Sequence, residues 1–192
     1  TMGELMKIAK VKSGSDNNMR KFVFLGDPAL KLSYPKYNVI TSQINNDSIC
    51  LPIDTLKALS KVTVKGYLAD EAGNKITNFN GKLYPTVYDK YSHVITLGND
   101  NPPCPPFPFI IRKNILYKGK VSVINGDFTF TFIVPKDINY TYGYGKISYY
   151  AENGNSDAAG NFDNFIIGGS DTNFVPDNQG PNIELYLNDK NF

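Results

Sequence analysis

The stretch KVSVINGDFTFTF, residues 120–132, decides the fold class of this chain. Asn125-Gly126 at its centre is the pair preferred in a two-residue type I′ hairpin turn, because both central residues need a positive φ. The register of such a turn sets three cross-strand pairs: Ile124 with Asp127, Val123 with Phe128, and Val121 with Phe130. Polar residues then share the opposite face: Ser122, Thr129 and Thr131. The sequence therefore predicts a β-hairpin with one apolar core face.

Short runs of alternating apolar residues continue on both sides of this hairpin. Turn residues separate them, and no segment of helical periodicity intervenes. The runs are KVTVKGYLAD (61–70), GKLYPTVYDK (81–90), HVITLG (93–98), FPFIIRKNILYKG (107–119), KVSVI (120–124), DFTFTFIV (127–134), KISYYAE (146–152) and NFDNFIIGG (161–169). Strands at this spacing predict an all-β protein, an immunoglobulin-like β-sandwich of about seven to eight strands, over residues 61–169.

The N-terminal segment follows a different pattern. Leu5, Ile8 and Ala9 recur at helical spacing, which indicates the end of a helix. Phe22–Leu25 is a wholly apolar run closed by Gly-Asp-Pro, which is typical of a strand buried on both faces of an α/β domain. Nothing else in the first 35 residues could bury such a strand. Residues 1–34 are therefore predicted to be the C-terminal remnant of an upstream α/β domain.

The two remaining segments are predicted to be linkers. Residues 35–60 lack sustained periodicity, so we expect some extended backbone there and one helical turn over Asp54–Ser60. Residues 170–192 begin as a polar linker and continue into a strand pattern, in which Ile183, Leu185 and Leu187 alternate with polar or aromatic residues. A single strand needs a partner, so this pattern is expected to open a following β-domain.

Composition excludes several functions. The 192 residues include 20 Lys plus Arg and 18 Asp plus Glu, a formal net charge of +2. The basic residues are dispersed, so nothing in the charge pattern favours nucleic acid or an anionic membrane as partner. No run approaches the ~20 apolar residues of a membrane-spanning helix. We therefore expect neither nucleic-acid binding nor membrane insertion.

Candidate catalytic residues are few. His93 is the single histidine, and a Cys-His pair with Cys104 is conceivable. Cys104 lies in PPCPP, however, where flanking prolines prevent a helix N-terminus from lowering the thiol pKa. No GxSxG nucleophile elbow is present. The sequence therefore predicts no catalytic residue in this chain.

Three binding features have two interpretations each. The Asp/Asn-rich stretches 154–165 and 171–180 offer oxygen ligands for calcium, but they also suit solvated turns, and no cofactor is otherwise expected. Cys50 and Cys104 could form a disulfide or remain two free thiols. Five tyrosines could form a carbohydrate-stacking surface, although strand alternation would direct about half of them into the core: Tyr140, Tyr142, Tyr144, Tyr149 and Tyr150.

Two parts of the sequence resemble a known family. MRKFVFLGDPALKLSYPKYNV (19–39) resembles the end of the catalytic domain of gingipain-type cysteine peptidases. In that family Gly26-Asp27-Pro28, followed by Ala29, Leu30 and Leu32 here, would close a caspase-like α/β domain. The stretches at 54–90 and 117–162 resemble the members of the family that act as sortases of the type IX secretion system. Together the two parts cover nearly the whole chain.

The resemblance implies a parent enzyme at the bacterial outer surface that cleaves sorting domains from secreted cargo and attaches the cargo to lipopolysaccharide. The family's catalytic His and Cys lie upstream of Gly-Asp-Pro, whereas His93 and both cysteines lie downstream of it. No catalytic residue is therefore carried over. The expected role is an extracytoplasmic accessory β-sandwich that supports the catalytic domain or binds secreted cargo. Its expected partners are that upstream domain and a downstream β-domain; a surface adhesion or glycan-binding module is the alternative.

Overall fold

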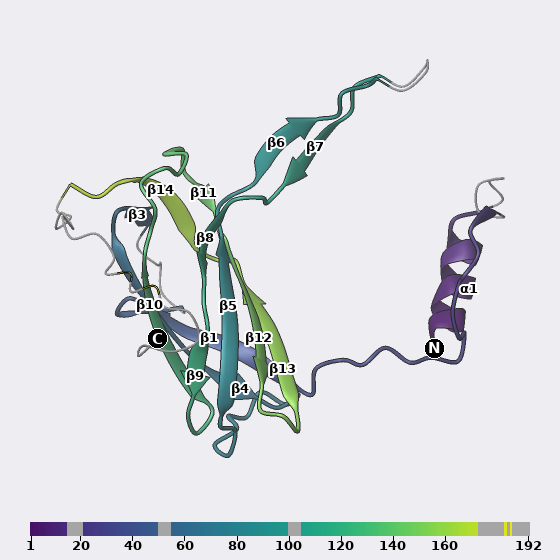
Figure 1. Cartoon of the computed structure of the whole chain (residues 1–192), viewed down its shortest axis with the longest axis horizontal. Helices are drawn as coiled ribbons and strands as arrows, with labels where there is room; N and C mark the ends of the chain where they lie inside the picture. The colour runs from purple at the N-terminus through teal and green to yellow at the C-terminus, as the bar shows by residue number, and fades with distance from the viewer. Residues whose placement is uncertain (15–20, 50–54, 100–104, 173–182, 184, 186–192) are drawn as a thin grey trace. The chain divides into compact units, whose positions relative to one another are not determined.

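The computed structural model describes residues 1–14, 21–49, 55–99, 105–172, 183 and 185. These residues contain one helix, α1 (Met2–Lys12), and fourteen strands (Figure 1). The strands are β1 (Tyr37–Ile44), β2 (Asp47–Ser48), β3 (Leu56–Ala58), β4 (Lys61–Ala69), β5 (Gly81–Tyr88), β6 (Ser92–Ile95), β7 (Pro108–Ile111), β8 (Ile115–Lys118), β9 (Val121–Val123), β10 (Asp127–Ile133), β11 (Gly143–Tyr144), β12 (Lys146–Glu152), β13 (Asp157–Phe162) and β14 (Ile166–Ser170). Two units are distinct, Thr1–Lys36 and Tyr37–Phe192.

The main sheet of the second unit confirms the all-β prediction. Its strand order is β10-β4-β1-β13-β12-β5-β8, with β9 also paired to β5 and β2 to β1. Strand β1 is antiparallel to β4 and parallel to β13, and the other neighbours are antiparallel. Strand β1 therefore connects the β4 and β10 side of the sheet to the β13, β12, β5 and β8 side, in a mainly β fold that forms a sandwich. The β9–β10 turn brings the two ends of the sheet together, so the sandwich is nearly closed.

Aromatic side chains from opposite layers form the core. Phe130 on β10 stacks on Tyr117 of β8 with ring centroids 5.5 Å apart, and Phe128 meets Tyr149 of β12 at 5.6 Å. Strand β10 alternates strictly, so its three phenylalanines are buried while the residues between them are exposed. Burial of each such ring contributes about 1.5–3 kcal/mol. The alternation of apolar and polar residues along the β10 sequence therefore identifies the face of the strand that packs in the core.

The structure contains the predicted turn but a different strand pairing. Asn125 and Gly126 have φ of 52° and 79°, and Ile124 pairs with Asp127 across them. Beyond the turn the strands part, and the predicted pairs Val123–Phe128 and Val121–Phe130 do not form. Instead β9 pairs Val123 with Gly81 and Val121 with Leu83, whereas β10 pairs Phe128 with Gly66 and Phe130 with Val64. The two strands separate because each belongs to a different layer.

The sheet also begins earlier than predicted. Strand β1 occupies much of the segment 35–60 that was expected to be a linker, and its Val39, Thr41 and Ile44 are buried. The expected helical turn over 54–60 is replaced by β3, which pairs in parallel with β14. Polar residues in β1 hide its alternation: Thr41 points inward, where its hydroxyl lies 2.7 Å from the Tyr149 hydroxyl. A buried polar group is tolerated when it has a hydrogen-bond partner. In the sequence, however, a polar residue at a buried position interrupts the apolar alternation, so the segment resembles a loop.

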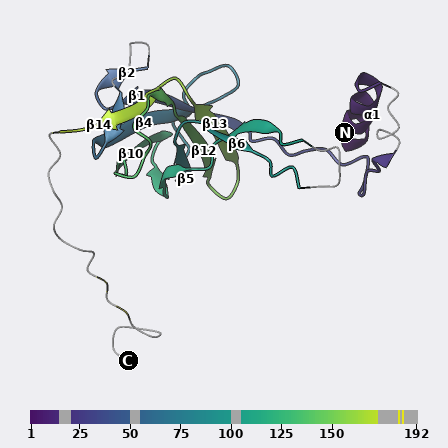
Figure 2. The same cartoon turned by 90° about the horizontal axis from the view of Figure 1, so that it is seen from above.

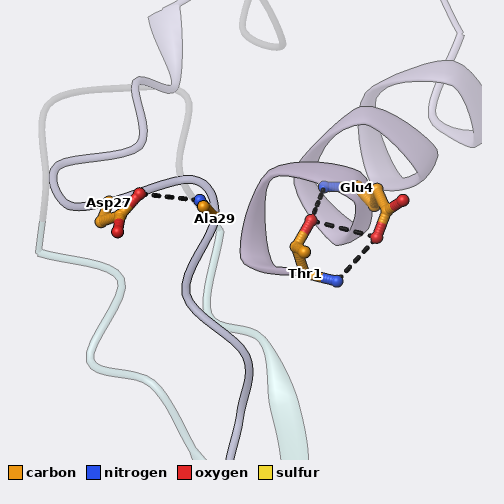
Figure 3. A network of polar contacts seen from close by, with 4 residues as sticks. All are labelled: Thr1, Glu4, Asp27 and Ala29. Carbon is orange, nitrogen blue, oxygen red and sulfur yellow. Dashed lines mark hydrogen bonds and ion pairs between the residues drawn. The ribbon is translucent and has the colours of Figure 1, made fainter.

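The first unit contains the predicted helix. Thr1 Oγ1 accepts a hydrogen bond from the Glu4 amide and Glu4 Oε2 accepts one from the Thr1 amine, which completes a capping box (Figure 3). The Gly-Asp-Pro segment supplies further acceptors. The carbonyls of Pro28 and Leu30 accept from the Gly3 and Met2 amides, and Asp27 Oδ1 accepts from the Ala29 amide at 2.8 Å (Figure 3). The segment therefore satisfies the open donors of the first helical turn.

Most of the large apolar residues described in this unit are exposed, and none of them is buried. Phe22–Leu25, expected as a buried strand, is not a strand here, and Phe22, Val23 and Leu25 are all exposed. In α1 the side chains of Leu5, Ile8 and Val11 are exposed as well, and none of its residues is buried. A strand buried on both faces needs paired strands and covering helices. The described residues of the first unit contain no strand to pair with it, which explains why this strand does not form here.

Candidate functional site

A two-stranded arm extends from the sandwich of the second unit. Strands β6 and β7 form it, and among the described residues they pair only with each other. Figures 1 and 2 both show the pair projecting beyond the end of the main sheet. We call residues 91–99 and 105–112 the arm.

Both faces of the arm carry apolar side chains, most of them exposed. The register sets Val94 opposite Phe109 on one face, and Ile95 opposite Pro108 on the other. Side chains that a soluble surface seldom presents together are accessible here: Ile95 is 64% exposed, Leu97 84%, Phe107 66% and Ile110 55%. Several large apolar side chains exposed on one short hairpin are typical of an interaction site.

A cavity of about 570 Å³, lined by aromatic and polar side chains, lies where the arm joins the sandwich. Its wall is built from four places in the sequence: the end of β5, the start of the arm, the β7–β8 connection and the β10–β11 loop. Three tyrosines (Tyr91, Tyr142 and Tyr144) and two asparagines (Asn114 and Asn139) are among the lining residues. A concave site with aromatic walls and several polar groups is the usual form of a small-molecule site.

A buried ion pair forms part of the cavity wall. Lys90 Nζ lies 2.9 Å from Asp89 Oδ1, and the two side chains are 10% and 2% exposed. The same oxygen accepts from the Lys90 amide at 2.8 Å. The Lys90 stem packs on Gly143, where an added Cβ would come within 2.9 Å of its Cδ. Removal of either charge would leave the other buried and unpaired, so the pair fixes the geometry of this wall.

Arg112 holds one of the tyrosines in place. Its guanidinium carbon lies 4.0 Å from the centroid of the Tyr91 ring, a cation–π contact. Arg112 Nη2 donates to the Tyr144 carbonyl at 3.4 Å, while its Nε and Nη1 are buried without a hydrogen-bond partner. The arginine thus links the base of the arm to β11.

The five tyrosines singled out from the sequence are divided by the structure. Tyr142 and Tyr144 line the cavity, whereas the Tyr140 hydroxyl donates to the Lys136 carbonyl in the same loop. Tyr149 is a core residue, and burial raises the pKa of its hydroxyl while the hydrogen bond with Thr41 lowers it in part. Tyr150 stacks on Tyr84, on the opposite face of β12. Strand alternation was expected to bury about half of the five, but only Tyr149 is buried.

The sequence did not single out the ion pair, Arg112 or Tyr91. They fall at the ends of strands, where no periodicity marks them, and only the fold brings positions 89–91 next to 112 and 139–144. His93, the one candidate catalytic residue that is described, is exposed on β6 and also lines the cavity. Cys50 and Cys104 lie outside the described residues, and so does most of the predicted strand after 182.

The stretch 154–165 forms a turn and a strand. Asn153 Oδ1 accepts from the amides of Asn155 and Ser156, and Asp157 begins β13, where it pairs with Glu152. Most of the second stretch, 171–180, lies outside the described residues. Within the described part of the chain, no group of three or more His, Cys, Asp or Glu side chains is placed to hold a metal ion. The same part has no helix of the length and apolarity needed to span a membrane.

The chain is similar to part of a protein of known structure. No profile of a known protein family matches the chain, and no curated protein sequence matches it. A crystal structure of the sporulation control protein Spo0M from Bacillus subtilis aligns with 72% of this chain and 51% of its own, at 12% identity and a TM-score of 0.37, from which we infer nothing. Dimeric latent PorU from Porphyromonas gingivalis aligns with 90% of this chain at 29% identity and a TM-score of 0.60. The alignment spans 17% of PorU, so this chain is similar in sequence and structure to one part of that protein.

Proposed function

We propose that this chain is a non-catalytic accessory region of a gingipain-like cysteine peptidase that serves as a type IX secretion sortase. The observation that carries the proposal is the likeness to PorU, which extends over 90% of this chain. The family resemblance of Gly26-Asp27-Pro28 supports it, because it implies that the catalytic His and Cys precede this region. Such a protein would act outside the cytoplasm, at the bacterial outer membrane or cell surface.

Within this role, the arm docks the sandwich onto the catalytic domain of the same protein. Its apolar residues lie on both faces, so a single flat contact would leave half of them exposed. A cleft or a junction between two surfaces would cover both faces and remove water from both. His93 is the only ionisable residue among the described positions of β6 and β7, so apolar burial rather than charge would drive the contact.

Association with the catalytic domain tests this role. The catalytic domain encoded by the same gene is produced separately, and its affinity for this chain is measured by calorimetry. We expect the double variant Ile95→Ser/Ile110→Ser to weaken binding at least about tenfold, equivalent to about 1.4 kcal/mol. Ile133→Ser is the matched control, because Ile133 is 61% exposed on β10 rather than on the arm. Absence of binding, or equal weakening in the control, would contradict the docking role; binding of sorting-domain cargo alone would point to cargo recognition.

The absence of catalysis has its own test. The isolated chain is incubated with a broad panel of peptide substrates, and we expect no turnover. Cleavage that disappears in the Cys104→Ala variant would show that this region carries its own nucleophile.

A surface adhesion or glycan-binding module is the second candidate function. The cavity with its exposed tyrosines favours it, and it does not require docking through the arm.

A further inference from the structure

We propose that the cavity at the base of the arm binds a saccharide, with Tyr142 and Tyr91 as stacking surfaces and the neighbouring amide and hydroxyl groups as hydrogen-bond partners. The site does not depend on the accessory role proposed above, because it is complete within the described part of this chain.

Tyr142 is the first stacking surface. Its ring packs against two consecutive glycines: an added Cβ on Gly168 would lie 2.9 Å from Tyr142 Cδ1, and one on Gly169 would lie 3.0 Å from the Tyr142 hydroxyl oxygen. Bare backbone therefore supports one side of the ring. The residue is nevertheless 69% exposed. A large aromatic side chain that is held in place yet remains open to solvent is preorganised for a ligand.

Tyr91 is the second stacking surface. One ring face is occupied by the Arg112 guanidinium, 4.0 Å from the centroid, and the residue is 52% exposed. Arg112 is itself tied to the Tyr144 carbonyl, so the position of this ring is fixed from beneath. The two supported rings come from the arm and the β10–β11 loop, and both line the same cavity.

The polar groups of the cavity specify the class of ligand. Asn139 Oδ1 accepts from the Thr141 amide, which orients the Asn139 side-chain amide and leaves its NH₂ as a donor. Asn114 contributes a second amide and Thr141 a hydroxyl. A pyranose has an apolar C–H face, which suits an aromatic ring, and a rim of hydroxyls, each of which donates and accepts. A proline-rich peptide would also stack on the two rings, but it would leave the amides and the hydroxyl without hydrogen-bond partners. Each unpaired polar group would cost binding free energy.

The experiment uses the whole chain and a panel of methyl glycosides of glucose, galactose, mannose, N-acetylglucosamine and glucuronic acid. Saturation-transfer NMR detects binding, and perturbation of the tyrosine ring resonances locates it. We expect at least one glycoside to bind and to perturb Tyr142 and Tyr91. Tyr142→Ala should weaken that binding about tenfold, the effect of losing one stacking contact, whereas Tyr142→Phe should retain it.

Tyr140→Ala is the matched control. Tyr140 is 47% exposed in the same loop but does not line the cavity, so binding should be unchanged. The proposal is overturned if no glycoside binds, if Tyr140→Ala weakens binding as much as Tyr142→Ala does, or if a proline-rich peptide binds and no glycoside does. None of these outcomes bears on docking through the arm, which is measured with a different partner and different variants.

Discussion

Phe130 shows how much stability a single core residue provides. Its ring stacks with Tyr117, Phe128 and Phe132, and the residue is 5% exposed. We expect Phe130→Ala to lower the free energy of unfolding by about 3–5 kcal/mol, because the lost contacts leave a cavity. Ile133→Ala, on the exposed face of the same strand, should stay within about 0.5 kcal/mol of wild type. Denaturant midpoints check both; similar midpoints for the two variants would show that the faces of β10 are assigned wrongly.

Gly66 permits two strands and an aromatic ring to approach closely. An added Cβ there would lie 2.2 Å from the Ile40 carbonyl oxygen and 2.4 Å from Phe128 Cζ. We therefore expect Gly66→Ala to cost about 1–3 kcal/mol through overpacking. Lys65→Ala, at the adjacent exposed position, is the control. Thermal unfolding measures both variants, and a Gly66→Ala protein as stable as the control would contradict the close approach.

Tyr149 makes stability depend on alkaline pH. Burial raises the pKa of its hydroxyl above the ordinary value of about 10. The stability that this hydroxyl contributes is therefore fully present below about pH 10, where Tyr149 is protonated in both the folded and the unfolded protein. It is lost as rising pH deprotonates Tyr149 in the unfolded protein first. Between about pH 9 and pH 11 we expect wild type to lose about 1 kcal/mol more than Tyr149→Phe. Urea titrations at the two pH values measure this difference, and equal losses would contradict the burial of Tyr149.

The strands show what the sequence could and could not predict. Strict alternation in β4, β10 and β12 identified them, because each has one buried face and one exposed face. Strand β1 escaped prediction because it joins two layers and carries the polar Thr41 inward. Strand β13 contains Asp157, Gly160 and Asn161, so its composition is that of a turn; Gly160 is needed there because an added Cβ would lie 2.1 Å from the Val39 carbonyl oxygen. The glycine that allows this close packing, together with the polar residues beside it, therefore makes β13 hard to recognise as a strand from the sequence.

The cavity could not be predicted for a related reason. Two of its three exposed tyrosines, Tyr142 and Tyr144, belong to a cluster visible in the sequence, whereas Tyr91 does not. Its other features depend on contacts between distant segments, such as Arg112 beneath Tyr91. A local pattern carries no information about such contacts.

The arm should add little to the stability of the sandwich. Ile95 and Ile110 are 64% and 55% exposed, so Ile95→Ser/Ile110→Ser should change the free energy of unfolding by no more than about 0.5 kcal/mol per site. Val123→Ser, at a position 1% exposed, should be strongly destabilising by comparison. Denaturant unfolding separates the two, and an equally destabilised arm variant would mean that the arm is part of the core.

At the scale of the whole molecule, the chain consists of two units that differ in whether they have a buried core of their own. The sandwich has its own core, whereas helix α1 of the first unit buries none of its residues. We expect a variant that lacks residues 1–36 to retain the melting temperature of the sandwich to within a few degrees. Calorimetry measures this, and unfolding of the truncated protein would contradict the independence of the two units.

We propose that the sandwich is an accessory region whose apolar arm docks on the catalytic domain of a PorU-like protein. Hydrogen exchange tests it most directly, by comparing the isolated chain with the full-length protein encoded by the same gene. We expect the amides of Val94, Ile95 and Phe109–Ile111 to exchange markedly more slowly in the full-length protein, and those of β4 and β10 to exchange alike in both. Equal exchange of the arm amides in the two proteins would contradict it.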